Sequence, residues 1–136
     1  MLEHQAVRVP ATTSNLGAGY DTFGAAVDLH LFARTVDRTG RAERVRTRGE
    51  GGESLECGDD NLVWRSFVGW CERHEVAVPD VAVDVTSEIP LERGLGSSSA
   101  AIVAGLALAR AVTDTPPGDL GLAQVAAELE GHPDNV

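Results

Sequence analysis

Lysine is absent from this chain of 136 residues, and aromatic residues and cysteines are few. All 11 basic residues are arginines. Because the Walker-type phosphate-binding loop requires a lysine, that class of nucleotide-binding protein is excluded. The chain carries 21 acidic residues and a net charge of −10, which disfavours nucleic acid as a partner. A phosphate ligand would therefore need local devices, namely backbone N–H groups, a helix N-terminus or a metal ion.

Long apolar runs are also missing, and we expect no leader segment. No run approaches the roughly 18–20 apolar residues that span a bilayer, so we expect no membrane partner. Residues 1–5 lack a basic segment followed by an apolar core, which is not the pattern of a secretory signal. Cys57 and Cys71 lack C-x-x-C spacing and are expected to be free thiols. We therefore expect a cytoplasmic protein with one domain over residues 1–136.

The apolar pattern predicts strands first and helices later. Strands are expected at 6–9, ending at Pro10, and at 23–36, 41–48 and 81–85. Helices are expected at 61–73 with Asp59 and Asp60 as caps, at 97–112, and at 118–130 between Asp119 and Gly131. This order predicts an α+β domain with a mixed sheet and helices on one face.

A glycine- and serine-rich segment precedes the most apolar helix. Residues 94–99 read Gly-Leu-Gly-Ser-Ser-Ser, and residues 100–109 are apolar on nearly every side. Such a helix is expected to be buried all round. Its N-terminus offers unpaired N–H groups and about half a positive charge, which suits an anion. The alternative is structural, in that the serines cap a core helix and the glycines make a tight turn.

Three further segments combine residues that could carry chemistry. Residues 15–21 place an amide and a carboxylate on a loop after the first strand, although an Asn/Gly turn explains them as well. Residues 130–135 bring two carboxylates, an imidazole and an amide together, and a carboxylate there could bind Mg²⁺. A helix end with a proline stop is the alternative. Asn61 could begin a helix beside an adenine or serve only core packing.

Several of these segments occur together and in order, and as a set they resemble a kinase family. Residues 9–21 resemble the first motif of homoserine kinases, and residues 130–136 resemble a segment typical of the bacterial members. Residues 90–100 resemble the second motif of the wider superfamily of galactokinase, homoserine, mevalonate and phosphomevalonate kinases. Residues 60–63 also match, so the resemblance spans essentially the whole chain. Ser99 departs from the pattern conservatively, because alanine is common there.

The resemblance implies a set of site residues. It implies L-homoserine as substrate, with ATP and Mg²⁺ as cofactors. Ser98 and Glu130 would bind the metal, and Asp134 and Asn135 would be catalytic by orienting the substrate hydroxyl. The substrate pocket would be lined by Asn15, Asp21, His132, Asp134 and Asn135. ATP would be bound by Asn61, Pro90, Leu91, Glu92, Arg93, Gly94, Leu95, Gly96, Ser97, Ser98 and Ser99.

The resemblance also implies a fold and a reaction. The fold would be an α+β kinase whose first domain is similar to the second domain of ribosomal protein S5. The reaction would transfer phosphate from ATP to the side-chain hydroxyl of L-homoserine, giving O-phosphohomoserine for threonine biosynthesis. Phosphoryl transfer depends mainly on positioning and charge neutralisation.

Length is the main departure from the family. Its members are roughly twice as long, so we expect an N-terminal, ATP-binding part without the C-terminal domain and with little kinase activity alone. Apolar surface around Ala100 and Val125 would then be exposed and favour self-association, for instance as a homodimer. The alternatives are another small-molecule kinase of the same superfamily or a non-catalytic nucleotide-binding fragment. RNA binding through the S5-like fold is disfavoured by the charge of −10.

Overall fold

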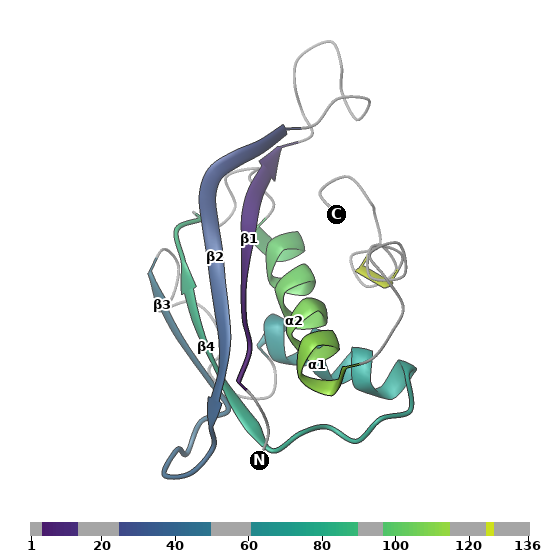
Figure 1. Cartoon of the computed structure of the whole chain (residues 1–136). Coiled ribbons are helices and arrows are strands. Elements are labelled where there is room, and N and C mark those ends of the chain that lie inside the picture. The colour runs from purple at the N-terminus through teal and green to yellow at the C-terminus, as the bar shows by residue number, and fades with distance from the viewer. Residues whose placement is uncertain (1–3, 14–24, 50–60, 90–96, 115–124, 127–136) are drawn as a thin grey trace.

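The computed structural model describes residues 4–13, 25–49, 61–89, 97–114 and 125–126. In these residues a mixed sheet of four strands packs against two helices (Figure 1). The elements in chain order are β1 (Ala6–Thr13), β2 (Ala25–Asp37), β3 (Val45–Gly49), α1 (Leu62–Arg73), β4 (Val81–Ser87) and α2 (Ser97–Thr113). The predicted α+β class, with a mixed sheet and helices on one face, is confirmed.

The order of the strands in the sheet is β1-β2-β4-β3. β1 and β4 each pair antiparallel with β2, whereas β3 runs parallel to β4 and is connected to it through α1. Because successive side chains of a strand point to opposite faces, this register divides the sheet into two surfaces. The "covered face", next to the helices, includes Leu31, Ala33, Val45, Val83 and Val85, all buried.

The opposite surface of the sheet carries polar and charged residues. No helix in the described part of the chain lies over it (Figure 1). We call it the "open face" and define it by the residues that share its register. They are Ala6 and Arg8 on β1, Phe32 and Arg34 on β2, Asp84 and Thr86 on β4, and Arg46 and Arg48 on β3.

β1 is longer than its sequence predicts. Pro10 was expected to end the strand, but pairing with β2 continues to Thr13 after a register shift between Pro10 and Ala11. β1 lies at the edge of the sheet within the described residues, and edge strands and bulges tolerate a residue that lacks an N–H donor. The expectation of a strand end at Pro10 was therefore wrong. The strand expected at 41–48 is shorter, beginning at Val45.

α1 matches the predicted helix closely, except at its cap. Asn61 is the N-cap, and its side-chain Oδ1 accepts a hydrogen bond from the backbone N–H of Val63 at 2.9 Å. The expectation that Asp59 or Asp60 caps this helix was wrong, since an Asn side chain satisfies the same donors. Val63, Phe67 and Trp70 follow helical spacing and are buried, so α1 contributes one apolar stripe to the core.

α2 packs beside α1 and contacts β1 and β2. Ile102, Leu106 and Ala109 are buried, whereas Val103 and Ala107 are half-buried. The helix is therefore not buried all round as expected. Ala100 itself is only 3% exposed, and the partly exposed apolar residues near it on α2 are Ala101 and Val103.

The last predicted helix is described at two residues only. Val125 and Ala126 are helical, and Val125 is half-buried. The rest of the predicted helix at 118–130, with Asp119 and Gly131, lies outside the described residues. In the part of the chain that is described, no helix has the length and apolar character that crossing a membrane requires.

Candidate functional site

The structure places two of the predicted site residues completely. Asn61 precedes α1 and Ser99 lies in the first turn of α2, where the backbone of Ser97 and Ser98 begins the helix. The other predicted residues lie outside the described residues, and their roles stay predictions. They are Asn15, Asp21, Pro90, Leu91, Glu92, Arg93, Gly94, Leu95, Gly96, Glu130, His132, Asp134 and Asn135.

The N-terminus of α2 has the features that an anion requires. The helix begins at Ser97, so the N–H groups of its first turn have no partners within the helix. Its first turn contains no acidic residue that would repel an anion. Over 17 residues the aligned peptide dipoles add about half a positive charge at this end. The end of α2 can therefore stabilise a phosphate group electrostatically.

Ser99 presents a buried hydroxyl at this end of α2. The residue is 1% exposed, and its Oγ has no hydrogen-bond partner within the described part of the chain. An unpaired buried hydroxyl costs roughly 1–3 kcal/mol, so such groups are uncommon unless something completes them. Ser99 could donate to a phosphate oxygen, which fits the predicted role of its segment.

Asn61 has a structural role that its sequence left open. It is 3% exposed, and besides accepting from Val63 through Oδ1 it accepts through its backbone carbonyl from the N–H of Arg65 at 2.8 Å. These bonds fix the first turn of α1. The structure thus shows Asn61 as a helix cap, and its contact with adenine stays a prediction.

A close crossing of α1 and α2 connects these two positions, and no motif in the sequence predicts it. A Cβ atom built on Gly105 in the middle of α2 would lie 2.2 Å from the carbonyl oxygen of Val63. The two backbones can approach this closely only because residue 105 has no side chain. Ser99 precedes Gly105 by six residues, which is about 9 Å along the helix axis. Because Gly105 contacts Val63, the start of α1 is held beside the first half of α2. A single glycine in an otherwise apolar helix was the available signal.

The start of α1 is also fixed from the side. The Arg44 guanidinium carbon lies 4.4 Å from the ring centroid of Trp64, and Trp64 stacks on Phe67 with centroids 4.9 Å apart. Trp64 is 4% exposed, so its cation–π contact forms away from water, where such contacts are strongest. These residues position α1 and do not themselves line the start of α2.

The predicted metal site falls mainly outside what the structure describes. In the described ranges no group of three or more His, Cys, Asp or Glu side chains could hold a metal ion. Glu130 and the side chain of Ser98 are not among the described groups. Mg²⁺ binding therefore stays a prediction from the resemblance.

The chain is similar to known kinases along its whole length. The family of GHMP kinase N-terminal domains matches residues 61–136. The curated homoserine kinase of Synechococcus sp. is 46% identical over 131 residues, covering 96% of this chain. The solved structure of the homoserine kinase from Cytophaga hutchinsonii superimposes with a TM-score of 0.79 at 28% identity, covering 100% of this chain.

Other kinases share the fold at lower identity. The mevalonate kinase of Methanococcus jannaschii superimposes with a TM-score of 0.65 at 14% identity over 96% of this chain, a likeness of fold alone. The chain spans 42% of the Synechococcus relative and 45% of the Cytophaga protein. The matched proteins are thus about twice as long, in agreement with the length expected from the motifs.

Proposed function

This chain belongs to the GHMP kinases, and from that membership we propose that it is the nucleotide-binding N-terminal part of a homoserine kinase. The reaction would transfer the γ-phosphate of ATP to the side-chain hydroxyl of L-homoserine. The P–O bond to ADP breaks, a P–O bond to the substrate forms, and the hydroxyl proton is released. The product, O-phosphohomoserine, would serve threonine biosynthesis in the cytoplasm.

One observation carries the choice of substrate. The chain is 46% identical to a homoserine kinase over 96% of its length, whereas the mevalonate kinase that shares its fold is only 14% identical. A fold shared across the superfamily does not select a substrate, because substrates are chosen by side chains at the site. Identity over 96% of the chain therefore favours L-homoserine over mevalonate or a sugar.

The described residues support nucleotide binding in particular. The N–H groups of the first turn of α2, which have no partner within the helix, and the unpartnered Ser99 hydroxyl both suit phosphate oxygens. Pro90 to Ser98 would complete this cradle, with Asn61 next to the adenine. Mg²⁺ on Ser98 and Glu130 would supply further charge neutralisation when bound.

The substrate residues complete the proposal. Asp21 would face the substrate ammonium, and Asn15 and His132 would bind its polar groups. Asp134 or Asn135 would orient the attacking hydroxyl. Positioning of this kind is the main contribution that a protein makes to phosphoryl transfer. Self-association as a homodimer is part of the proposal and does not affect the chemistry.

Two measurements test the proposal. Calorimetry with Mg·ATP on this chain should show binding that Ser98→Ala weakens by about tenfold, the effect of one lost hydrogen bond to a charged group. A coupled ADP assay on the full-length gene product should show turnover with L-homoserine and little with mevalonate or galactose. Preferred turnover of either rival substrate would reject homoserine kinase while leaving nucleotide binding intact.

A second candidate is a non-catalytic nucleotide-binding module. The family match over residues 61–136 is to the N-terminal domain alone, which is compatible with nucleotide binding in the absence of turnover. The same two measurements separate the candidates. Tight Mg·ATP binding without turnover of any substrate by the full-length gene product would select the non-catalytic module.

A further inference from the structure

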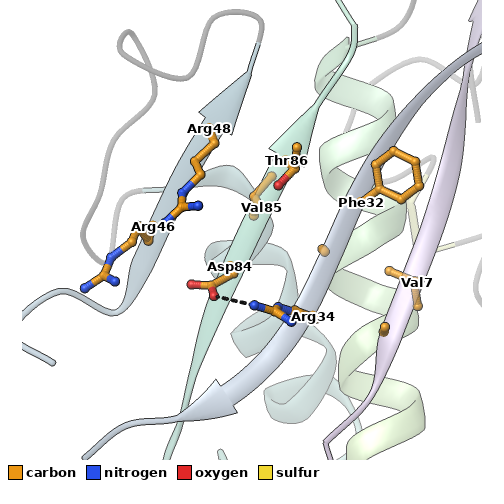
Figure 2. A pocket seen from close by; sticks show the side chains of 10 residues that line it. Val7, Phe32, Arg34, Arg46, Arg48, Asp84, Val85 and Thr86 are labelled. Carbon is orange, nitrogen blue, oxygen red and sulfur yellow. Dashed lines mark hydrogen bonds and ion pairs between the residues drawn. The ribbon is translucent and has the colours of Figure 1, made fainter. Parts of the chain in front are cut away.

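The open face of the sheet carries two rows of side chains that run across all four strands. One row contains Ala6, Arg34, Asp84 and Arg46, which are partners in the register, and the next contains Arg8, Phe32, Thr86 and Arg48. Figure 2 shows Phe32 and Arg34 on β2, Asp84 and Thr86 on β4, and Arg46 and Arg48 on β3. Four of the 11 arginines thus gather on one surface of a protein with a net charge of −10.

The acidic groups among these arginines are already neutralised. The Asp84 carboxylate lies 2.7 Å from Arg41 Nη1 and 3.4 Å from Arg34 Nη2. The Arg41 side chain is only 10% exposed, so this shorter ion pair is shielded from water. Glu43 is paired with Arg46 at 2.7 Å. The charges of Arg41 and Glu43 cancel each other. The net charge of the remaining groups is +2, because three arginines (Arg34, Arg46 and Arg48) face one carboxylate (Asp84).

The guanidinium groups on the open face keep donors for a ligand. The Arg34 side chain is 66% exposed, and its contact with Asp84 is long. Arg48 is exposed, and within the described ranges it has no ion pair. A guanidinium presents five donors in a planar fork that matches a phosphate group. Two such forks on strands β2 and β3 can approach one anion from opposite sides.

A hollow lies between these residues. Its volume is about 320 Å³, within the range of small-ligand sites, and its lining includes Phe32, Arg34, Arg46, Arg48, Asp84 and Thr86. Phe32 is 39% exposed, which makes it one of two large apolar side chains exposed in the described part of the chain. Phe32 therefore offers an apolar contact in the hollow, and the guanidinium groups in its lining offer contacts for an anion. The hollow faces away from α2, so it is separate from the proposed nucleotide site.

We propose that this hollow binds a small phosphomonoester whose phosphate is attached to a flat apolar group. The dianion matches the excess of two positive charges and would lie between Arg34 and Arg48. The flat group would lie against Phe32, and Thr86 would donate to the ester or phosphate oxygen. A long polyanion such as RNA fits less well, because Asp28 and Glu88 flank His30 at the end of the same face and the whole chain is negative.

The test uses phenyl phosphate as the probe and two-dimensional amide NMR as the readout. Phenyl phosphate should shift the amide signals of Phe32, Thr86 and Arg48, and should bind at least about tenfold more tightly than inorganic phosphate because of its ring. Arg48→Gln should weaken binding of both probes by about fivefold to tenfold, as expected for a lost charge-assisted contact. Phe32→Leu should weaken phenyl phosphate binding and leave inorganic phosphate unchanged.

Two controls separate this site from the proposed nucleotide site. Arg65→Gln removes an exposed arginine of α1 on the other side of the sheet and should leave phenyl phosphate binding unchanged. Arg48→Gln should leave Mg·ATP binding unchanged, whereas Ser98→Ala should leave phenyl phosphate binding unchanged. Shifts confined to the start of α2, equal affinity in Arg48→Gln, or binding of an RNA oligonucleotide without binding of phenyl phosphate would each overturn the proposal.

Discussion

The two faces of the sheet are built from the same strands and have opposite chemistry. On β2, Leu31 and Ala33 point to the covered face and are at most 4% exposed, while Phe32 and Arg34 point to the open face. Alternation along the strand allows this separation, because neighbouring residues never share a face. The covered face binds the helices and sets stability, whereas the open face is free to carry charge. Substitutions on the two faces should therefore have separable effects.

The largest expected difference in the free energy of unfolding comes from replacing a phenylalanine by alanine on each side of the sheet. Phe67→Ala removes a ring from α1 that is 0% exposed and stacked on Trp64, so unfolding should require about 3–5 kcal/mol less free energy. Phe32→Ala on the open face should cost less than about 1 kcal/mol, since that ring is 39% exposed. Urea unfolding followed by circular dichroism measures both. Similar losses for the two variants would show that the open face is buried by something else.

A second comparison concerns the helix layer that covers the sheet. Gly105→Ala places a Cβ atom against the backbone carbonyl of Val63, so the helices must separate at a cost of about 1–3 kcal/mol. Gly69→Ala on α1 is the matched control, because a Cβ there meets nothing within 4 Å. Alanine is the better helix former, so the control should gain about 0.5–1 kcal/mol. Thermal unfolding should move the two variants in opposite directions. A Gly105→Ala variant as stable as the parent chain would disprove the tight crossing.

The main elements could be predicted from local pattern. The alternation from Val81 to Val85 and the helical spacing of Val63, Phe67 and Trp70 both appear in the structure, because each reflects one face in a core. Pro10 was misread because its tolerance depends on β1 lying at an edge, which is a fact about the whole sheet. Asp60 and Asn61 are both good caps, so sequence alone could not choose between them.

The site was less accessible to sequence reasoning than the fold. The segment ending at Ser99 was found from its composition and resemblance, but its unpartnered hydroxyl becomes visible only once burial is known. Arg34 and Arg48 lie far apart in the chain, and they share the open face through pairing with β4. Register of that kind depends on non-local contacts, so the sequence gives no signal that these arginines gather.

The smallest expected effect is on the pH dependence of stability, which should differ between the helix side and the open face of the sheet. Burial raises the pKa of the Cys71 thiol on α1 from 9.0 to about 11, with a smaller contribution from Glu72. Its stabilising effect is complete below pH 9 and is lost as the pH rises towards 11, because the unfolded chain releases this proton first. After allowance for screening by solvent, about 1–2 kcal/mol of the free energy of unfolding should be lost.

Near the open face, hydrogen bonding to Arg46 lowers the pKa of Glu43 from 4.5, so the stabilising contribution of Glu43 is present above that pH and is lost in acid. Urea unfolding at pH 8 and pH 10.5 should show the alkaline loss in the parent chain and a smaller one in Cys71→Ala. A further measurement at about pH 3 should show that Glu43→Gln alters only the loss of stability in acid. If Cys71→Ala lost as much stability in alkali as the parent chain, the thiol would not be the group that titrates.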